Sequence, residues 1–325
     1  MGAGRRGLGA GLVMLGLLAV GLGAYWLLTR PAPLSGAQLS GALAAAEAVE
    51  AGGAATPGAS GLSGQQVFDA AGCASCHAAP GAEPADRPVL AGGKRFATPF
   101  GTFVAPNISP DPKAGIGAWT DAQLMNAIMR GISPGGAHYY PAFPYATYGR
   151  ADPADIALLV AHLRGLPADA TPSQPHEIGF PFNIRRNMGI WKRLFVDHDW
   201  VVANAAEPQI ARGRYLVEAL AHCGECHTPR NALGGIDRGA WLSGAPNPTG
   251  KGRIPDITPR GLSWSEADIA NYLKTGFTPE YDTAGAEMAE VVENLSKLPE
   301  TELKAIAAYL KSLPAGSEGT GDGAK

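Results

Sequence analysis

Two short segments carry all four cysteines of the chain, and each has the spacing that attaches a haem. Both segments have the pattern Cys-x-x-Cys-His; the residues are Cys73, Cys76 and His77 in the first, and Cys223, Cys226 and His227 in the second. In this pattern two thiols lie one helical turn apart and add to the two vinyl groups of haem, while the adjacent histidine binds the iron. We therefore predict two covalently bound haem c groups (iron).

Other chemistries use a single Cys-x-x-Cys pair. A thioredoxin-like dithiol, a zinc site and a buried thiol pair each fit one copy of this spacing. Two complete copies, each followed directly by histidine, favour haem over these alternatives. No cysteine is left for a structural disulfide, so each domain has to be stabilised by its haem and its own apolar core.

Length and charge limit the possible classes of protein. A chain of 325 residues exceeds one ordinary domain, and a prior of roughly 100 to 200 residues per domain suggests two units with one haem motif each. The formal net charge is -3 and the sequence pI about 6.2, which gives no basic surface for nucleic acid.

An uncharged stretch at residues 7–29, rich in leucine and valine, follows Arg5 and Arg6. A bilayer core needs about 20 helical residues, whereas a cleaved signal has an apolar core of about 7 to 15, so we expect an uncleaved anchor. The positive-inside bias keeps the arginines cytoplasmic. The predicted location is a single pass through the bacterial inner (cytoplasmic) membrane, with the haem domains in the periplasm, where c-type haem is attached.

Composition and motif positions divide the chain into six segments. A stretch of mostly Ala, Gly, Pro and Ser follows the anchor, and it buries too little apolar surface to offset its ordering entropy. The predicted segments are a cytoplasmic stub and transmembrane anchor at 1–30, a flexible linker at 31–60, a first haem domain at 61–170, a connector at 171–205, a second haem domain at 206–314 and a disordered tail at 315–325.

The two haem domains are internal repeats. Matching residues are Pro106 and Pro255, Trp119 and Trp264, Gly131 and Gly276, and Pro134 and Pro279, the last three pairs at a spacing of 145 residues. A Thr or Ser after each tryptophan is typical of a helix N-cap. Each half ends in an amphipathic helix, at 153–166 and 299–313, so we predict an all-α fold of two tandem domains.

This pattern resembles the class I cytochrome c fold, and more closely the multihaem cytochrome c subunits of bacterial membrane-bound alcohol and gluconate dehydrogenases. The resemblance runs from about residue 61 to residue 314. Its most specific stretches are Ala-Pro-Asn-Ile-Ser-Pro-Asp at 105–111, Gly-Ile-Gly-Ala-Trp at 115–119 and His-Tyr-Tyr-Pro-Ala-Phe-Pro-Tyr at 138–145. It implies two tandem class I cytochrome c domains behind the transmembrane helix; the third haem domain common in those subunits is not found.

The resemblance also implies a methionine as the sixth iron ligand, which favours ferrous iron and raises the potential. Met288 is the candidate for the haem of the second half (haem 2), because it lies in the expected loop and is the only methionine after Cys223. A methionine that merely packs in the core is the alternative.

The first half departs from the family pattern at this position. The spacing of 145 residues carries Met288 onto Phe143, and a phenyl ring cannot bind iron. Three outcomes stay open for the haem of the first half (haem 1). His138 is the tentative sixth ligand and gives bis-histidine ligation with a lower potential; Met125 or Met129 reaches the iron; or the site is open beneath Phe143 and binds a small molecule.

A basic cluster, defined as Arg185, Arg186, Lys192 and Arg193, lies in the connector. Its side chains either neutralise haem propionates or are solvated.

No nucleotide fingerprint or hydrolytic triad occurs, so we expect an electron carrier rather than an enzyme. The resemblance implies that a periplasmic or membrane dehydrogenase subunit delivers electrons to it, and that a quinone, a soluble cytochrome or a terminal oxidase of the respiratory chain accepts them. One alternative is a haem-1 ligand-binding or peroxidase-like enzyme that uses haem 2 as electron donor, with His138 as the acid/base group. Another is a redox shuttle without an obligate dehydrogenase.

Overall fold

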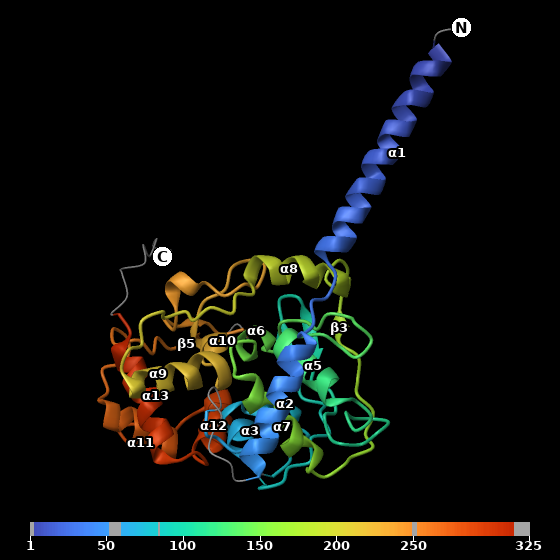
Figure 1. Cartoon of the computed structure of the whole chain (residues 1–325). Helices are drawn as coiled ribbons and strands as arrows, with labels where there is room; N and C mark the ends of the chain where they lie inside the picture. The colour runs from blue at the N-terminus through green and yellow to red at the C-terminus, as the bar shows by residue number, and fades with distance from the viewer. Residues whose placement is uncertain (1–2, 52–59, 84, 249–251, 315–325) are drawn as a thin grey trace.

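Two helical halves lie side by side, and one long helix projects away from them (Figure 1). The computed structural model describes residues 3–51, 60–83, 85–248 and 252–314. The projecting helix is α1 (Ala3–Leu28), and α8 (Met188–Phe195) lies at its base. The predicted tail at 315–325 lies outside the described residues.

The first half is built around α7 (Pro153–Arg164). Ile156 and Val160 of this helix are buried in the core. Helix α3 (Gly64–Ala70) packs against α7 at Gly64, where an added Cβ would lie 2.3 Å from the carbonyl oxygen of Leu158, so this approach needs glycine. The other helices of this half are α2 (Gly36–Glu50), α4 (Cys73–His77), α5 (Asp121–Arg130) and α6 (Tyr145–Tyr148).

The second half repeats this design around α13 (Glu300–Ser312). Helix α9 (Pro208–Tyr215) packs against α13 at Gly213, where an added Cβ would lie 1.9 Å from the carbonyl oxygen of Ala305. The other helical elements are η2 (Leu216–Leu220), α10 (Gly224–His227), η3 (Arg238–Ala240), α11 (Glu266–Thr275) and α12 (Ala286–Leu295), and η1 (Arg185–Asn187) precedes α8 in the connector.

Backbone hydrogen bonds repeat at the predicted spacing of 145 residues. Two bonds of 2.7 Å occupy matching positions, from Tyr139 N to Gly131 O and from Ala284 N to Gly276 O. Helices α5 and α11 both begin at the predicted Thr or Ser N-cap, which forms a capping box, and both end at a left-handed glycine. The internal repeat is therefore confirmed in the structure.

The predicted membrane anchor is wrong. A helix that crosses a membrane needs about 20 consecutive, mainly apolar residues. Within the ranges that the structure describes, no helix is both long and apolar enough to meet this requirement. This finding overturns the transmembrane segment at 1–30, the fold class that included it, and the single-pass location in the bacterial inner membrane.

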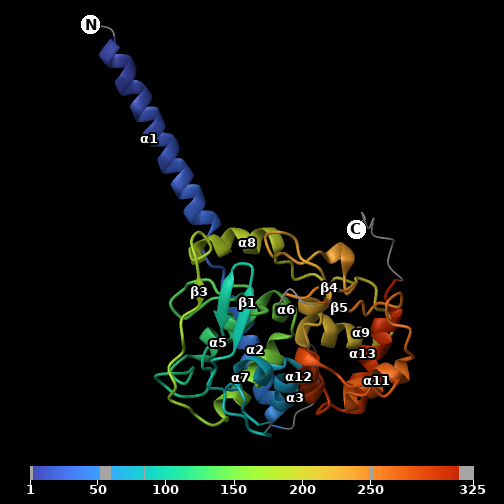
Figure 2. The same ribbon diagram turned by 180° about the vertical axis from the view of Figure 1, so that it is seen from behind.

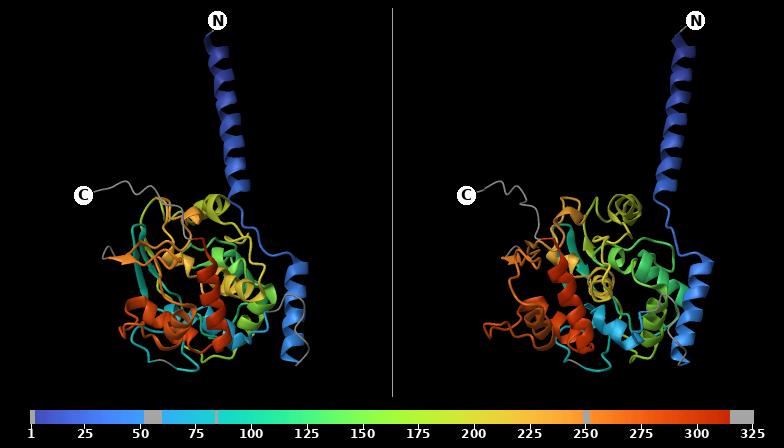
Figure 3. Two further views of the ribbon diagram at one scale, coloured as in Figure 1. Left: turned by 90° about the vertical axis from the view of Figure 1, so that its left-hand side faces the viewer. Right: turned by 60° about the vertical axis from the view of Figure 1, so that its left-hand side comes forward.

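Part of the predicted flexible linker at 31–60 is an ordered helix. Helix α2 packs against α7, and Leu34, Ala42 and Ala46 are buried. The small alanine side chains that suggested a tether instead let α2 lie close against the first half (Figure 3). The prediction of a linker is wrong for α2, whereas residues 52–59 lie outside the described part of the chain.

Two small sheets make the all-α prediction incomplete. Strands β1 (Arg95–Thr98) and β2 (Gly101–Val104) form an antiparallel hairpin, and β3 (Glu177–Ile178) pairs with β2. Strands β4 (Ala245–Pro246) and β5 (Arg253–Ile254) form a second antiparallel pair. Because β3 belongs to the connector, its pairing fixes the start of the connector to the first half.

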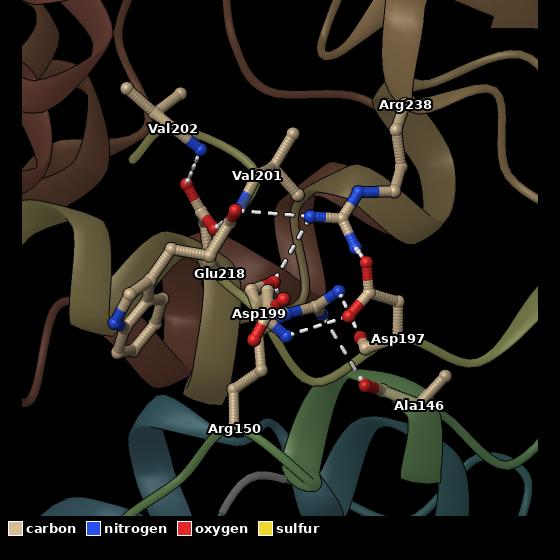
Figure 4. Close-up of polar contacts among 9 residues, drawn as sticks. Ala146, Arg150, Asp197, Asp199, Val201, Val202, Glu218 and Arg238 are labelled. Carbon is tan, nitrogen blue, oxygen red and sulfur yellow. Dashed lines mark hydrogen bonds and ion pairs between the residues drawn. The ribbon is translucent and has the colours of Figure 1, made fainter. Parts of the chain in front are cut away.

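The next part of the connector is held by an arginine from each half (Figure 4). Arg150 of the first half donates to the carbonyl oxygens of Asp197 at 2.7 Å and Asp199 at 3.0 Å. Arg238 of the second half pairs with the Asp197 carboxylate and donates to the carbonyl oxygen of Asp199 at 3.1 Å. This segment therefore joins the two halves through charge-assisted hydrogen bonds.

Glu218 fixes the end of the same segment to the second half. It lies in the π-helical turn η2, and its side chain is fully buried. Its carboxylate accepts three hydrogen bonds, from Val201 N at 2.6 Å, Val202 N at 3.1 Å and the Tyr309 hydroxyl at 2.6 Å. A buried carboxylate needs such partners, because burial without them is costly.

We predict that Glu218→Gln lowers the free energy of unfolding by about 2 kcal/mol, since a neutral amide replaces the charged acceptor of three hydrogen bonds. Denaturant unfolding of the haem-loaded protein measures the change. Glu207→Gln, at an exposed position, is the control and should change stability by less than about 0.5 kcal/mol. Equal stability of the two variants would contradict this account.

Candidate haem centres

The first cysteine of each motif packs against the core. Cys73, Cys76 and Cys223 are half-buried, and Cys226 is exposed. Burial raises the pKa of Cys73 to about 12, of Cys76 to about 11 and of Cys223 to about 12. Burial therefore favours the protonated form of these thiols.

The described residues around the motifs do not form a zinc site. Among the residues that the structure describes, no group of three or more His, Cys, Asp or Glu side chains could hold a metal ion. Structural zinc is usually held by four such ligands.

Each motif histidine is oriented by one hydrogen bond. His77 Nδ1 lies 2.8 Å from the carbonyl oxygen of Pro106, and His227 Nδ1 lies 2.8 Å from that of Pro255. A carbonyl only accepts, so Nδ1 carries the proton and Nε2 presents its lone pair for iron. Burial lowers the pKa of both histidines, which keeps each imidazole neutral as ligation requires.

Matching loops place the two proline carbonyls. Gly92 N donates to His77 O at 2.7 Å, and Gly244 N donates to His227 O at 2.8 Å. Further along each loop, a 3.0 Å bond joins residue 108 to residue 90, and another joins residue 257 to residue 242. The repeated sequences Pro-Asn-Ile-Ser and Pro-Asp-Ile-Thr therefore have a structural role. The carbonyl oxygen of their proline accepts a hydrogen bond from the motif histidine.

Each half has partly exposed apolar side chains of the kind that pack against a porphyrin. They are packed against the core on one side and remain partly exposed on the other; they are Ile108, Trp119 and Phe143 in the first half, and Trp241, Ile257, Trp264 and Met288 in the second. A macrocycle attached at the motif would cover their exposed faces. The donor set and this lining together fit one haem in each half.

Met288 and Phe143 occupy matching places. Met288 lies in the first turn of α12, half-buried against the core, and Phe143 lies just before α6. Each follows a loop closed by an isolated antiparallel bridge, which joins 132 with 138 in the first half and 277 with 283 in the second. Phe143 packs edge-on against Tyr139, Tyr145 and Tyr148.

The other candidates for the sixth ligand of haem 1 are engaged elsewhere. His138 is buried, and its Nε2 lies 2.8 Å from the carbonyl oxygen of Thr29, at the end of α1. Met125 and Met129 are packed within the core. If His138 binds iron through Nε2, the hydrogen bond between this nitrogen and the Thr29 carbonyl oxygen has to break first.

Three of the four residues in the basic cluster of the connector donate to carbonyl oxygens at helix ends, and the fourth, Arg185, donates to the carbonyl oxygen of His138. Arg186 and Arg193 donate to the carbonyl oxygens of Trp26 at 2.9 Å and Leu28 at 2.7 Å, at the C-terminal end of α1. Lys192 donates to the last carbonyl oxygens of α5 at 2.6 and 2.8 Å. Cationic donors satisfy such carbonyls and interact favourably with the helix dipole.

The second half contacts the first haem motif, which the sequence did not indicate. Helix α12 of the second half lies beside α3 and α4 of the first (Figure 2). Asn294 donates to the Ser75 hydroxyl at 2.7 Å, and Lys94 pairs with Glu290 at 2.6 Å. The helix that carries Met288 therefore also contacts the first haem motif.

Comparison with known proteins agrees with this geometry. The cytochrome c family model matches residues 62–167 and 210–314. The chain belongs to the cytochrome c family. With one domain of this family around each motif, it holds two covalently bound haem c groups.

Relatives are similar over most of the chain. It is 50% identical over 311 residues to a protein of Cereibacter sphaeroides named diheme cytochrome c-type, covering 96% of this chain and 99% of the relative. It is 41% identical to the fructose dehydrogenase cytochrome subunit of Gluconobacter japonicus and 35% identical to the gluconate 2-dehydrogenase cytochrome c subunit of Pantoea cypripedii. The chain spans 53% and 59% of those two proteins, slightly more than half their length.

We predict that Cys223→Ala combined with Cys226→Ala removes one of the two covalent haems, because both thioether bonds of haem 2 are lost. Haem content per protein, measured after denaturation and extraction of non-covalent haem, should fall from two to one. Cys73→Ala with Cys76→Ala is the matched variant and should give the same count. Two retained haems in either double variant would overturn the assignment of the attachment sites.

Proposed function

We propose that this protein is a dihaem electron carrier. In this proposal it accepts electrons from a periplasmic or membrane-bound dehydrogenase partner and passes them to a quinone, a soluble cytochrome or a terminal oxidase. The observation that carries the proposal is the presence of two complete haem-attachment sites in one chain, with α12 of the second half in contact with the first motif. The names of two relatives, cytochrome subunits of fructose and gluconate dehydrogenases, support a dehydrogenase as the donor.

The residues of the chain hold the haems and set their electronic surroundings. Haem iron supplies a one-electron couple, whose potential depends on the axial ligands and on burial. The Pro106 and Pro255 carbonyls orient the proximal histidines, and hydrogen bonding to Nδ1 raises their basicity toward iron. This arrangement suits a carrier, because the ligand geometry is fixed before and after the electron moves.

We infer that Met288 is the sixth ligand of haem 2. Support comes from its position in the first turn of α12, where the structure has a helix and not the expected loop, and from its half-buried side chain against the core. His138 stays the candidate for haem 1, and ligation through its Nε2 would have to break the contact with the Thr29 carbonyl oxygen.

A second function is favoured by Phe143 at the position that matches Met288. An open haem 1 would bind small ligands or react with peroxide, with haem 2 as electron donor. Peroxide chemistry needs a distal acid/base group, and the imidazole of His138 is directed to Thr29. The electron carrier is therefore the function that the geometry supports better.

We predict that a dehydrogenase reduces both haems only when its substrate is present. The haem-loaded protein is mixed anaerobically with fructose, gluconate or alcohol dehydrogenase catalytic subunits, and reduction is followed by optical absorption with and without substrate. A quinone or an oxidised soluble cytochrome should then re-oxidise it. Failure with every donor, together with rapid consumption of peroxide, would favour the enzyme instead.

We predict that Met288→His lowers the potential of one haem by on the order of 0.1 V and leaves the other unchanged, since axial ligands span about 0.8 V. Potentiometric titration measures both values. Met125→Leu, which replaces a core methionine by a residue of similar volume, is the control and should change neither. An unchanged pair of potentials in Met288→His would rule out this ligand.

A further inference from the structure

One residue before each haem motif has a left-handed backbone. In the first half it is Gly72, with φ 60°, and in the second half it is His222, with φ 44°. Both positions directly precede the first motif cysteine, Cys73 or Cys223. Glycine adopts this conformation without steric cost, whereas a side chain with a Cβ is strained in it. The second half therefore keeps a histidine where the repeat shows that glycine suffices.

The imidazole of His222 reaches across to the first half. Its Nε2 lies 3.2 Å from the carbonyl oxygen of Ala71, and an added Cβ on Gly72 would lie 4.0 Å from the same nitrogen. The Tyr148 hydroxyl donates to the same carbonyl at 3.0 Å, and the two rings meet edge-on with centroids 5.9 Å apart. Because the carbonyl is an acceptor, Nε2 carries the proton, and burial lowers the pKa of His222, which keeps the ring neutral.

This bond connects the two haem-attachment segments almost directly. His222 is covalently bound to Cys223, and Ala71 is separated from Cys73 by Gly72 alone. We propose that His222 is a coupling residue: its hydrogen bond to Ala71 gives electrons a short, mainly covalent connection between the two haems. The proposal rests on the electron-carrier function above. One electron leaves the ferrous iron of one haem and reduces the ferric iron of the other, and no proton is exchanged.

Simple docking of the two halves is the competing explanation. Another bond across the same boundary joins the Thr147 hydroxyl to Glu225 Oε1 at 2.8 Å. Thr147→Val removes that bond at nearly constant volume. This variant therefore shows how the loss of one hydrogen bond between the halves changes the exchange rate while His222 and Ala71 stay in contact.

The test measures electron exchange between the haems of the isolated, fully oxidised, haem-loaded protein. A light or radiolysis pulse delivers less than one electron per molecule, and the absorbance then reports its redistribution at wavelengths where the two haems differ. The variants are His222→Gly, which suits the left-handed backbone and removes the imidazole, His222→Gln, which restores an N–H donor, and Thr147→Val.

We expect His222→Gly to slow the exchange, because the connection from His222 Nε2 to the Ala71 carbonyl is removed. His222→Gln should recover part of the rate, and Thr147→Val should stay within about twofold of the parent. An unchanged rate in His222→Gly, or equal slowing in His222→Gly and Thr147→Val, would overturn the proposal.

A second readout separates coupling from damage to the haem sites. The EPR spectra and the two midpoint potentials of His222→Gly should match the parent, because its imidazole contacts a backbone carbonyl and not the proximal histidines. Altered spectra or potentials would show that His222 shapes the haem site itself, which contradicts a coupling role. No partner takes part in these measurements, so their failure leaves the proposed dehydrogenase donor untouched.

Discussion

The hydrogen bond from each motif histidine to a proline carbonyl is the constraint on which the structure depends. Iron binds a neutral imidazole through Nε2, so Nδ1 needs an acceptor that fixes the tautomer and the direction of the ring. Pro106 and Pro255 supply it at the same distance of 2.8 Å. Matching loops place these carbonyl oxygens beside the histidines in both halves. Both halves also contain a helix pair that approaches closely at a glycine, Gly64 or Gly213.

The two halves also form one body. Arg150 of the first half and Arg238 of the second donate hydrogen bonds to the connector. Glu218 of the second half accepts a hydrogen bond from Val201 in the same segment. Helix α12 adds contacts to the first haem motif through Asn294. The haem sites are consequently fixed relative to each other by polar contacts at several points, and such contacts are specific in geometry although each contributes modestly to stability.

The sequence predicted what depends on local patterns. The haem motifs, the N-caps of α5 and α11 and the repeat with Met288 opposite Phe143 follow from residue types at fixed spacing. Contacts between distant segments could not be predicted in this way: α2 was interpreted as a tether although its alanines pack on α7. The bond from His138 to Thr29 is another example, since 109 residues separate them. The predicted anchor is wrong because glycine and alanine alternate with leucine and valine in residues 7–29, and no helix of the described residues is both long and apolar enough to cross a membrane.

A redox titration of the purified, haem-loaded protein tests the central claim most directly. Absorption at the haem bands is followed while the ambient potential is lowered in the absence of any partner. If the chain is a dihaem electron carrier, it takes up two electrons per molecule in two one-electron steps, and both steps reverse on re-oxidation. Uptake of a single electron, or a step that does not reverse, would contradict the account.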